Sequence, residues 1–121
     1  MEIVSLEHAA LNVSDLEASK KFYGVGLGLK EVPRPDFDFA GAWYVLGESQ
    51  QLHLIEEKSL VPTSNRRNHH FALRVRDIEA VEAQLKANGI KIAMGPHVRP
   101  DLVAQIFVSD PDGYIIELSN T

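Results

Sequence analysis

Four side chains that could bind a metal ion occupy matching places in the two halves of the sequence: His8, His53, His70 and Glu117. Three imidazoles and one carboxylate form a donor set that suits Zn, Ni, Co, Fe or Mn. A single histidine of this kind is more often a surface or hydrogen-bonded residue. A lone glutamate on a strand of alternating apolar and polar residues usually belongs to the face that meets solvent. Because both pairs recur at equivalent positions, the pattern favours a metal site.

The two halves of the chain repeat one another. Residues 8–18 align with residues 70–80, and seven of the eleven positions are identical. A second match near the end of each half places residues 52–55 over residues 116–119. The sequence therefore predicts two copies of one unit, at 1–57 and 68–121, joined by a polar linker at 58–67.

Each copy predicts the same order of elements, βαβββ. In the first copy, a capping box of Ser14 and Glu17 is expected to start the helix. In the second copy, Asp77 caps the helix and the Asn88-Gly89 pair stops it. The expected strands are 3–13, 29–32, 43–46 and 51–56, then 70–75, 91–94, 104–108 and 114–119. The residues Asp-Pro-Asp-Gly at 110–113 form a turn between the last two strands.

Alternation along the strands predicts which face each candidate ligand occupies. The apolar residues of the first and last strand of each copy point toward the helix, so His8, His53, His70 and Glu117 point to the uncovered face. If the copies pair about a pseudo-twofold axis, the four side chains converge. His97 is expected in a turn at Gly95-Pro96 and has no counterpart in the first copy.

Composition restricts the class of protein. The 121 residues are 45% hydrophobic and 24% charged, with a net charge of −5 and no cysteine. Disulfides, thiolate nucleophiles and cysteine-based metal clusters are therefore excluded. Basic residues are not clustered, which argues against nucleic-acid binding. The sequence has no signal peptide and no apolar run of membrane-spanning length, so we expect a soluble, cytoplasmic protein of one α+β domain.

The sequence resembles the vicinal oxygen chelate superfamily, which includes glyoxalase I, methylmalonyl-CoA epimerase, extradiol dioxygenases, and fosfomycin- and bleomycin-resistance proteins. The resemblance spans the chain and is most specific at residues 110–118, Asp-Pro-Asp-Gly-Tyr-Ile-Ile-Glu-Leu. It implies two βαβββ modules in an open, cup-shaped mixed sheet around one divalent ion, commonly in a homodimer. The family's metal positions map onto His8, His53, His70 and Glu117. Glyoxalase I usually has glutamate where this chain has His53.

The resemblance implies a metal-dependent lyase or isomerase of the lactoylglutathione lyase type, acting on a small substrate, such as a thiol adduct or an anion, chelated through adjacent oxygens. Glu117 could combine ligation with proton transfer, and His53 is the competing base. Arg34 and Arg99, each followed by proline, could hold an anionic group, and Trp43 could line the pocket. The alternatives are an Fe(II) extradiol dioxygenase, a fosfomycin-type transferase, and a metal-free, bleomycin-resistance-like binding protein.

Overall fold

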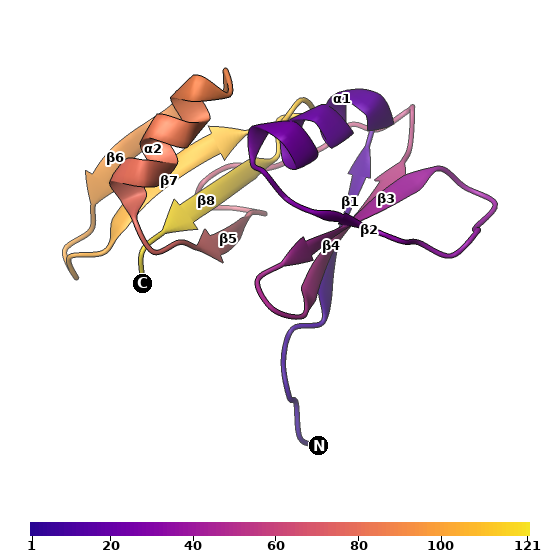
Figure 1. Cartoon of the computed structure of the whole chain (residues 1–121), viewed down its shortest axis with the longest axis horizontal. Helices are drawn as coiled ribbons and strands as arrows, with labels where there is room; N and C mark the ends of the chain where they lie inside the picture. The colour runs from indigo at the N-terminus through magenta and orange to yellow at the C-terminus, as the bar shows by residue number, and fades with distance from the viewer. The chain divides into compact units, whose positions relative to one another are not determined.

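The computed structural model describes all 121 residues, which form two compact units, Met1–Leu60 and Val61–Thr121 (Figure 1). Each unit has the element order βαβββ. The predicted α+β fold of two tandem modules is therefore confirmed. No helix of the chain combines the length and the apolar character that crossing a membrane requires.

The first unit is a mixed sheet of four strands with a helix packed on one face (Figure 1). Its strands are β1 (His8–Val13), β2 (Glu31–Val32), β3 (Gly41–Leu46) and β4 (Gln50–Glu56). They lie in the order β1-β4-β3-β2, with β1 parallel to β4 and the other neighbours antiparallel. The helix α1 (Leu16–Lys20) continues as the π-helical turn η1 (Lys21–Gly26) and packs against β3 and β4. Leu52 and Leu54 of β4 are fully buried.

In the first unit, the strands β2, β3 and β4 begin one or two residues away from the predicted positions, and the helix cap and the start of β1 differ more clearly. The N-cap of α1 is Asp15, whose carboxylate accepts a hydrogen bond from the Ala18 N–H, so the prediction of Ser14 as the cap was wrong. Strand β1 begins at His8 instead of residue 3, because β4, its ladder partner, begins only at Gln50. The residues before His8 are exposed and have no strand to pair with along the sheet.

The second unit repeats this architecture. Its strands are β5 (Phe71–Arg74), β6 (Ile92–Val98), β7 (Ala104–Ser109) and β8 (Ile115–Ser119), in the order β5-β8-β7-β6. Strand β5 runs parallel to β8, and the helix α2 (Ile78–Ala87) packs against β6 and β7. Ile106, Val108 and Ile116 are fully buried in this unit.

Local signals in the second unit were predicted well, with one exception. Asp77 caps α2 by accepting hydrogen bonds from two backbone N–H groups, and Gly89 ends the helix with a φ of 73°. The Asp110 carboxylate accepts backbone hydrogen bonds from Asp112 and Tyr114, which closes the predicted turn. His97 lies in β6 opposite a residue of β7, so its prediction as a turn residue was wrong. Strand pairing with register shifts extends β6 through that segment.

Candidate functional site

In the second unit, His70 and Glu117 lie side by side. Glu117 belongs to β8, and His70 directly precedes β5, the parallel neighbour of β8. The Nε2 atom of His70 is 3.2 Å from the Oε2 atom of Glu117. Glu117 is only 8% exposed, so this carboxylate meets its partners largely out of water.

The contacts of His70 orient its lone pair toward Glu117. The Nδ1 atom lies 3.1 Å from the backbone carbonyl oxygen of Asn68, which can only accept a hydrogen bond, so Nδ1 carries the proton. In the neutral imidazole, Nε2 then presents a lone pair to an oxygen of an ionised carboxylate. Two facing lone pairs require a positive species between them, either a proton or a metal cation. Two ligand atoms at about 2.1 Å from one ion lie roughly 3.0–3.4 Å apart, so this pair fits a divalent cation.

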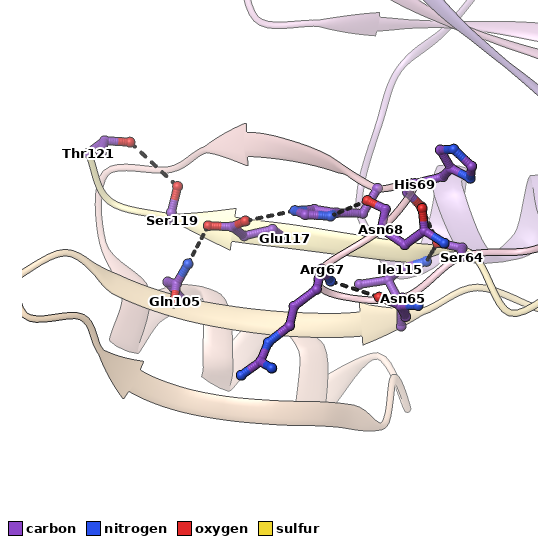
Figure 2. Close-up of polar contacts among 11 residues, drawn as sticks. Ser64, Asn65, Arg67, Asn68, His69, Gln105, Ile115, Glu117, Ser119 and Thr121 are labelled. Carbon is purple, nitrogen blue, oxygen red and sulfur yellow. Dashed lines mark hydrogen bonds and ion pairs between the residues drawn. The ribbon is translucent and has the colours of Figure 1, made fainter.

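The second oxygen of the Glu117 carboxylate is held by Gln105, a residue that sequence reasoning missed. The Gln105 Nε2 atom donates a hydrogen bond of 2.6 Å to Oε1 of Glu117 (Figure 2). Gln105 lies on β7, the antiparallel neighbour of β8, and is 8% exposed. Each oxygen of the carboxylate therefore has its own partner.

In the first unit, His8 and His53 also lie together, but their rings are stacked. Their centroids are 4.2 Å apart and their planes differ by 16°. The Nδ1 atom of His8 is hydrogen-bonded to the Glu7 carboxylate, which leaves Nε2 as the candidate donor atom. Because the lone pairs of an imidazole lie in the ring plane, two nearly parallel rings do not aim them at one point. These orientations therefore suit one metal ligand better than two.

His53 is enclosed between two rings. Strand β4 lies between β1 and β3, and the imidazole of His53 stacks on Trp43 from β3 as well as on His8 from β1. The Nε2 atom of His53 lies 2.8 Å from the amide oxygen of Gln51. Burial lowers the pKa of His53 below its ordinary 6.5, and the His8 and Arg34 charges lower it further, while Glu7 opposes them. Together these effects favour the neutral form of the His53 imidazole.

The two arginines that were candidates for substrate binding have different partners. Arg99 donates two hydrogen bonds to the carboxylate of Asp101, two residues along the chain. Arg34 has no carboxylate within ion-pair distance and donates to the backbone carbonyl of Phe39, 2.7 Å away. Its guanidinium lies over the rings of Phe37 and Phe39, at 5.0 and 4.9 Å from their centroids. Of the two cations, Arg34 alone retains an uncompensated charge.

The guanidinium of Arg34 lies beside Gly41, at a position where the second module has a side chain. Gly41 of β3 pairs with Ile55 of β4, just as Gln105 of β7 pairs with Ser119 of β8, so Gly41 and Gln105 are equivalent. A Cβ atom added at Gly41 would lie 3.1 Å from both the Nε and Nη2 atoms of Arg34. The missing side chain at Gly41 thus leaves room for the guanidinium, where the second module has an amide.

The structure therefore pairs the candidate ligands within each unit. His8 lies with His53, and His70 lies with Glu117. Neither unit gathers three or more side chains of ligand type in one group. Trp43 lies against His53, whereas Arg99 is paired with its own loop. Three of these side chains have polar partners that the sequence did not indicate: Glu7 contacts His8, Gln51 contacts His53, and Gln105 contacts Glu117.

The family model described as the Glyoxalase/Bleomycin resistance protein/Dioxygenase superfamily matches residues 5–118. "Glyoxylase I 4" of Arabidopsis thaliana is 28% identical over 99% of this chain and 72% of its own length. "Probable lactoylglutathione lyase" of Synechocystis sp. is 30% identical over 96% of this chain and 95% of its own length. Among solved structures, a Bacillus anthracis protein assigned to the glyoxalase family has a TM-score of 0.86 and 29% identity, covering 100% of this chain and 98% of its own.

Proposed function

This chain belongs to the Glyoxalase/Bleomycin resistance protein/Dioxygenase superfamily, and from that membership we propose that it is a metal-dependent lyase or isomerase of the lactoylglutathione lyase type. The names of relatives that are 28–30% identical along nearly the whole chain support this reaction class. The substrate is a small molecule with two adjacent oxygens. Its reaction moves a proton on a carbon next to a carbonyl group.

The observation that carries the proposal is the 3.2 Å contact between the Nε2 atom of His70 and the Oε2 atom of Glu117, a separation that also suits two ligands of one cation. We propose that both are ligands of one divalent ion of the Zn, Ni, Co, Fe or Mn group, together with His8. His8 resembles a metal ligand in its contacts, since its second ring nitrogen is bonded to a carboxylate. When bound, the ion supplies Lewis-acid polarisation of the substrate oxygens.

His53 fits the role of proton acceptor better than that of a fourth ligand. Its ring is sandwiched between two others and its lowered pKa keeps it neutral, so it can accept a proton at pH 7. Glu117 fits the ligand role, because Gln105 occupies one carboxylate oxygen and the other faces His70. His53 therefore takes the proton, and the Trp43 ring holds the imidazole in a fixed plane.

Arg34 is the residue that suits an anionic part of the substrate. Its guanidinium is already held in place by the Phe39 carbonyl and by two phenylalanine rings, which reduces the entropy lost when an anion binds. After burial and the His8 charge, the Arg34 charge also contributes to lowering the pKa of His53. An anion held by Arg34 therefore lies within the electrostatic reach of the proton acceptor.

The metal content of the purified protein tests the first part of the proposal. Protein prepared without chelators should contain about one divalent transition ion per chain by plasma mass spectrometry. His70→Ala and Glu117→Gln should lose the ion, and Arg99→Ala, which changes only an arginine paired within its own loop, should keep it. A wild-type protein that stays metal-free after reconstitution and binds a bleomycin-type drug would instead be a binding module.

A substrate panel tests the reaction class. We expect the protein to turn over hemithioacetals formed from 2-oxoaldehydes and thiols. Spectrophotometry at neutral pH measures this turnover. The set His8, His70 and Glu117 also matches the 2-His-1-carboxylate ligands of Fe(II) oxygenases, so extradiol ring cleavage is the second candidate. Cleavage of a catechol by protein loaded anaerobically with iron, without hemithioacetal turnover, would establish that second reaction.

Assembly as a homodimer in the cytoplasm belongs to the same proposal, because the family commonly forms such dimers. Sedimentation of the purified protein should give a mass close to twice the 13.5 kDa of one chain. A monomer that binds metal at full occupancy would show that pairing is dispensable for metal binding.

A further inference from the structure

We propose that Gln105 is a positioning residue that restricts Glu117 to a single coordinating oxygen, an inference that rests on the metal site proposed above. The amide donates to Oε1 of Glu117 (Figure 2). The other oxygen, Oε2, faces His70. The carboxylate then has one defined direction in which it can approach a cation. Gln105 touches neither the ion nor the substrate and acts only through Glu117.

The geometry explains how one amide can fix the carboxylate. Glu117 lies opposite Phe107 on β7, and Gln105 is two residues from Phe107 on the same face of the sheet. The amide therefore reaches the carboxylate along the diagonal between neighbouring strands, where long side chains can interact. Gln105 and Glu117 are each 8% exposed, so few water molecules can replace this hydrogen bond.

Burial makes the hydrogen bond between Gln105 and Glu117 more important for stability than it would be in water. An ionised carboxylate out of water needs its oxygens satisfied, and a hydrogen bond to a charged acceptor is stronger than one between neutral groups. Without the amide, Oε1 would seek another partner, and a second bond to the same cation is the nearest alternative. Gln105 would therefore limit the number of oxygens that Glu117 offers to a metal ion.

The first module lacks this device. The position equivalent to Gln105 is Gly41, and a guanidinium group fills the space beside it. His53, the counterpart of Glu117, is held by stacking on Trp43 and has no partner from the Gly41 position. The amide that contacts His53 comes from Gln51 on the same strand, so an amide from the neighbouring strand is a feature of the second module alone.

The test uses Co²⁺ as the probe and Gln105→Met as the main variant, which keeps the length of the side chain but removes its donor. Ser119→Ala is the matched control. Ser119 is buried, lies opposite Gln105 in the ladder and bonds to Thr121, with no bond to Glu117 (Figure 2). We expect Gln105→Met to weaken Co²⁺ binding about 10–100-fold, measured by competition with a chromophoric chelator, while Ser119→Ala matches the wild type.

The visible absorption of bound Co²⁺ gives a second readout that a loss of stability would not produce. A freed carboxylate oxygen raises the coordination number, so the ligand-field bands of Gln105→Met should lose intensity at saturating Co²⁺. If Gln105→Met fails to fold by circular dichroism, Gln105→Asn replaces it, because its amide is one methylene too short to reach Oε1. The same loss of affinity and band intensity is expected of it.

Separate results overturn the two proposals. If wild-type protein binds no Co²⁺, the proposed metal site is wrong and the role of Gln105 falls with it. If the wild type binds Co²⁺ and Glu117→Gln abolishes binding, but Gln105→Met matches Ser119→Ala in affinity and spectrum, the metal site stands and the positioning role is wrong.

Discussion

The indole of Trp43 lies flat on the imidazole of His53, with ring centroids 4.0 Å apart and planes 5° from parallel. The stack joins neighbouring residues of the antiparallel pair β3 and β4, where Trp43 and His53 are directly opposite. A stacked ring fixes the plane of the imidazole while leaving its edge, and therefore its nitrogen atoms, open to other groups. This relationship supports the proposed role of His53 as proton acceptor, and it supplies an optical reporter for that residue.

Fluorescence of Trp43, the single tryptophan of the chain, should report the protonation of His53. An imidazolium ion quenches a stacked indole by accepting an electron from its excited state. Because burial and the charges of His8 and Arg34 lower the pKa of His53, the midpoint of quenching should lie below pH 6.5. A pH titration of tryptophan emission in metal-free protein checks this. His53→Gln should abolish the transition, and a midpoint above 6.5 in the wild type would contradict it.

His53→Gln and Glu117→Gln should separate proton transfer from metal binding. We expect His53→Gln to keep its metal and lose turnover by about 10²–10⁴-fold, the usual range for a general base. Glu117→Gln should lose the metal, because the amide carries no negative charge for the cation. Metal content and kcat are measured on the same preparations. The opposite result, with Glu117→Gln metal-loaded but inactive and His53→Gln active, would make Glu117 the base.

Arg34→Ala and Arg99→Ala should differ in their effect on an anionic substrate. Arg34 has no carboxylate partner, so its removal should raise KM by about 10–100-fold, the worth of a hydrogen bond to a charged group. Arg99 is already paired with Asp101, so its removal should change KM little. Steady-state kinetics with substrates that carry or lack a carboxylate measures this. Equal effects on both substrates would show that Arg34 does not bind the anion.

Gly41→Ala should destabilise the first unit. The added methyl group would overlap the Leu54 carbonyl oxygen and press on the Arg34 guanidinium, and overpacking of this kind costs about 1–3 kcal/mol. Gly24→Ala is the matched control, since its methyl group would meet Tyr44 at an ordinary 3.4 Å. Thermal unfolding followed by circular dichroism should show a lower Tm for Gly41→Ala only. An equal Tm in both variants would mean that the backbone yields at Gly41.

The fold could be predicted because the signals that determine it are local or repeated. The repeat indicated two modules, and strand alternation separated the buried leucines of β4 from His53. The helix caps show where local signals become ambiguous. Ser14 and Asp15 are adjacent residues of equal capping ability, and the backbone conformation at Asp15 decides between them. The extended start of β1 was overpredicted because an apolar pattern says nothing about where the partner strand begins.

The candidate site was harder to predict because its contacts depend on strand register. Gln105 reaches Glu117 diagonally between the strands β7 and β8. The register of these two strands cannot be read from a local sequence pattern. Its one signal was a polar residue at the start of an apolar run, on the same face as Glu117. The stacking of His8 on His53 depends on side-chain rotamers, which the sequence does not encode directly. Asp101, two residues from Arg99, was a local signal that could have distinguished the two arginines.

Gly41 and Gln105 occupy equivalent positions in the two modules but differ in side chain. The two halves of the chain are therefore not interchangeable. A chain built from two copies of the second half would have two buried amide–carboxylate pairs and no imidazole enclosed by rings. A chain built from two copies of the first half would have stacked histidines and no buried amide–carboxylate pair. The two modules therefore share one scaffold but differ in what it positions. The second module positions a buried carboxylate, and the first positions an imidazole between aromatic rings.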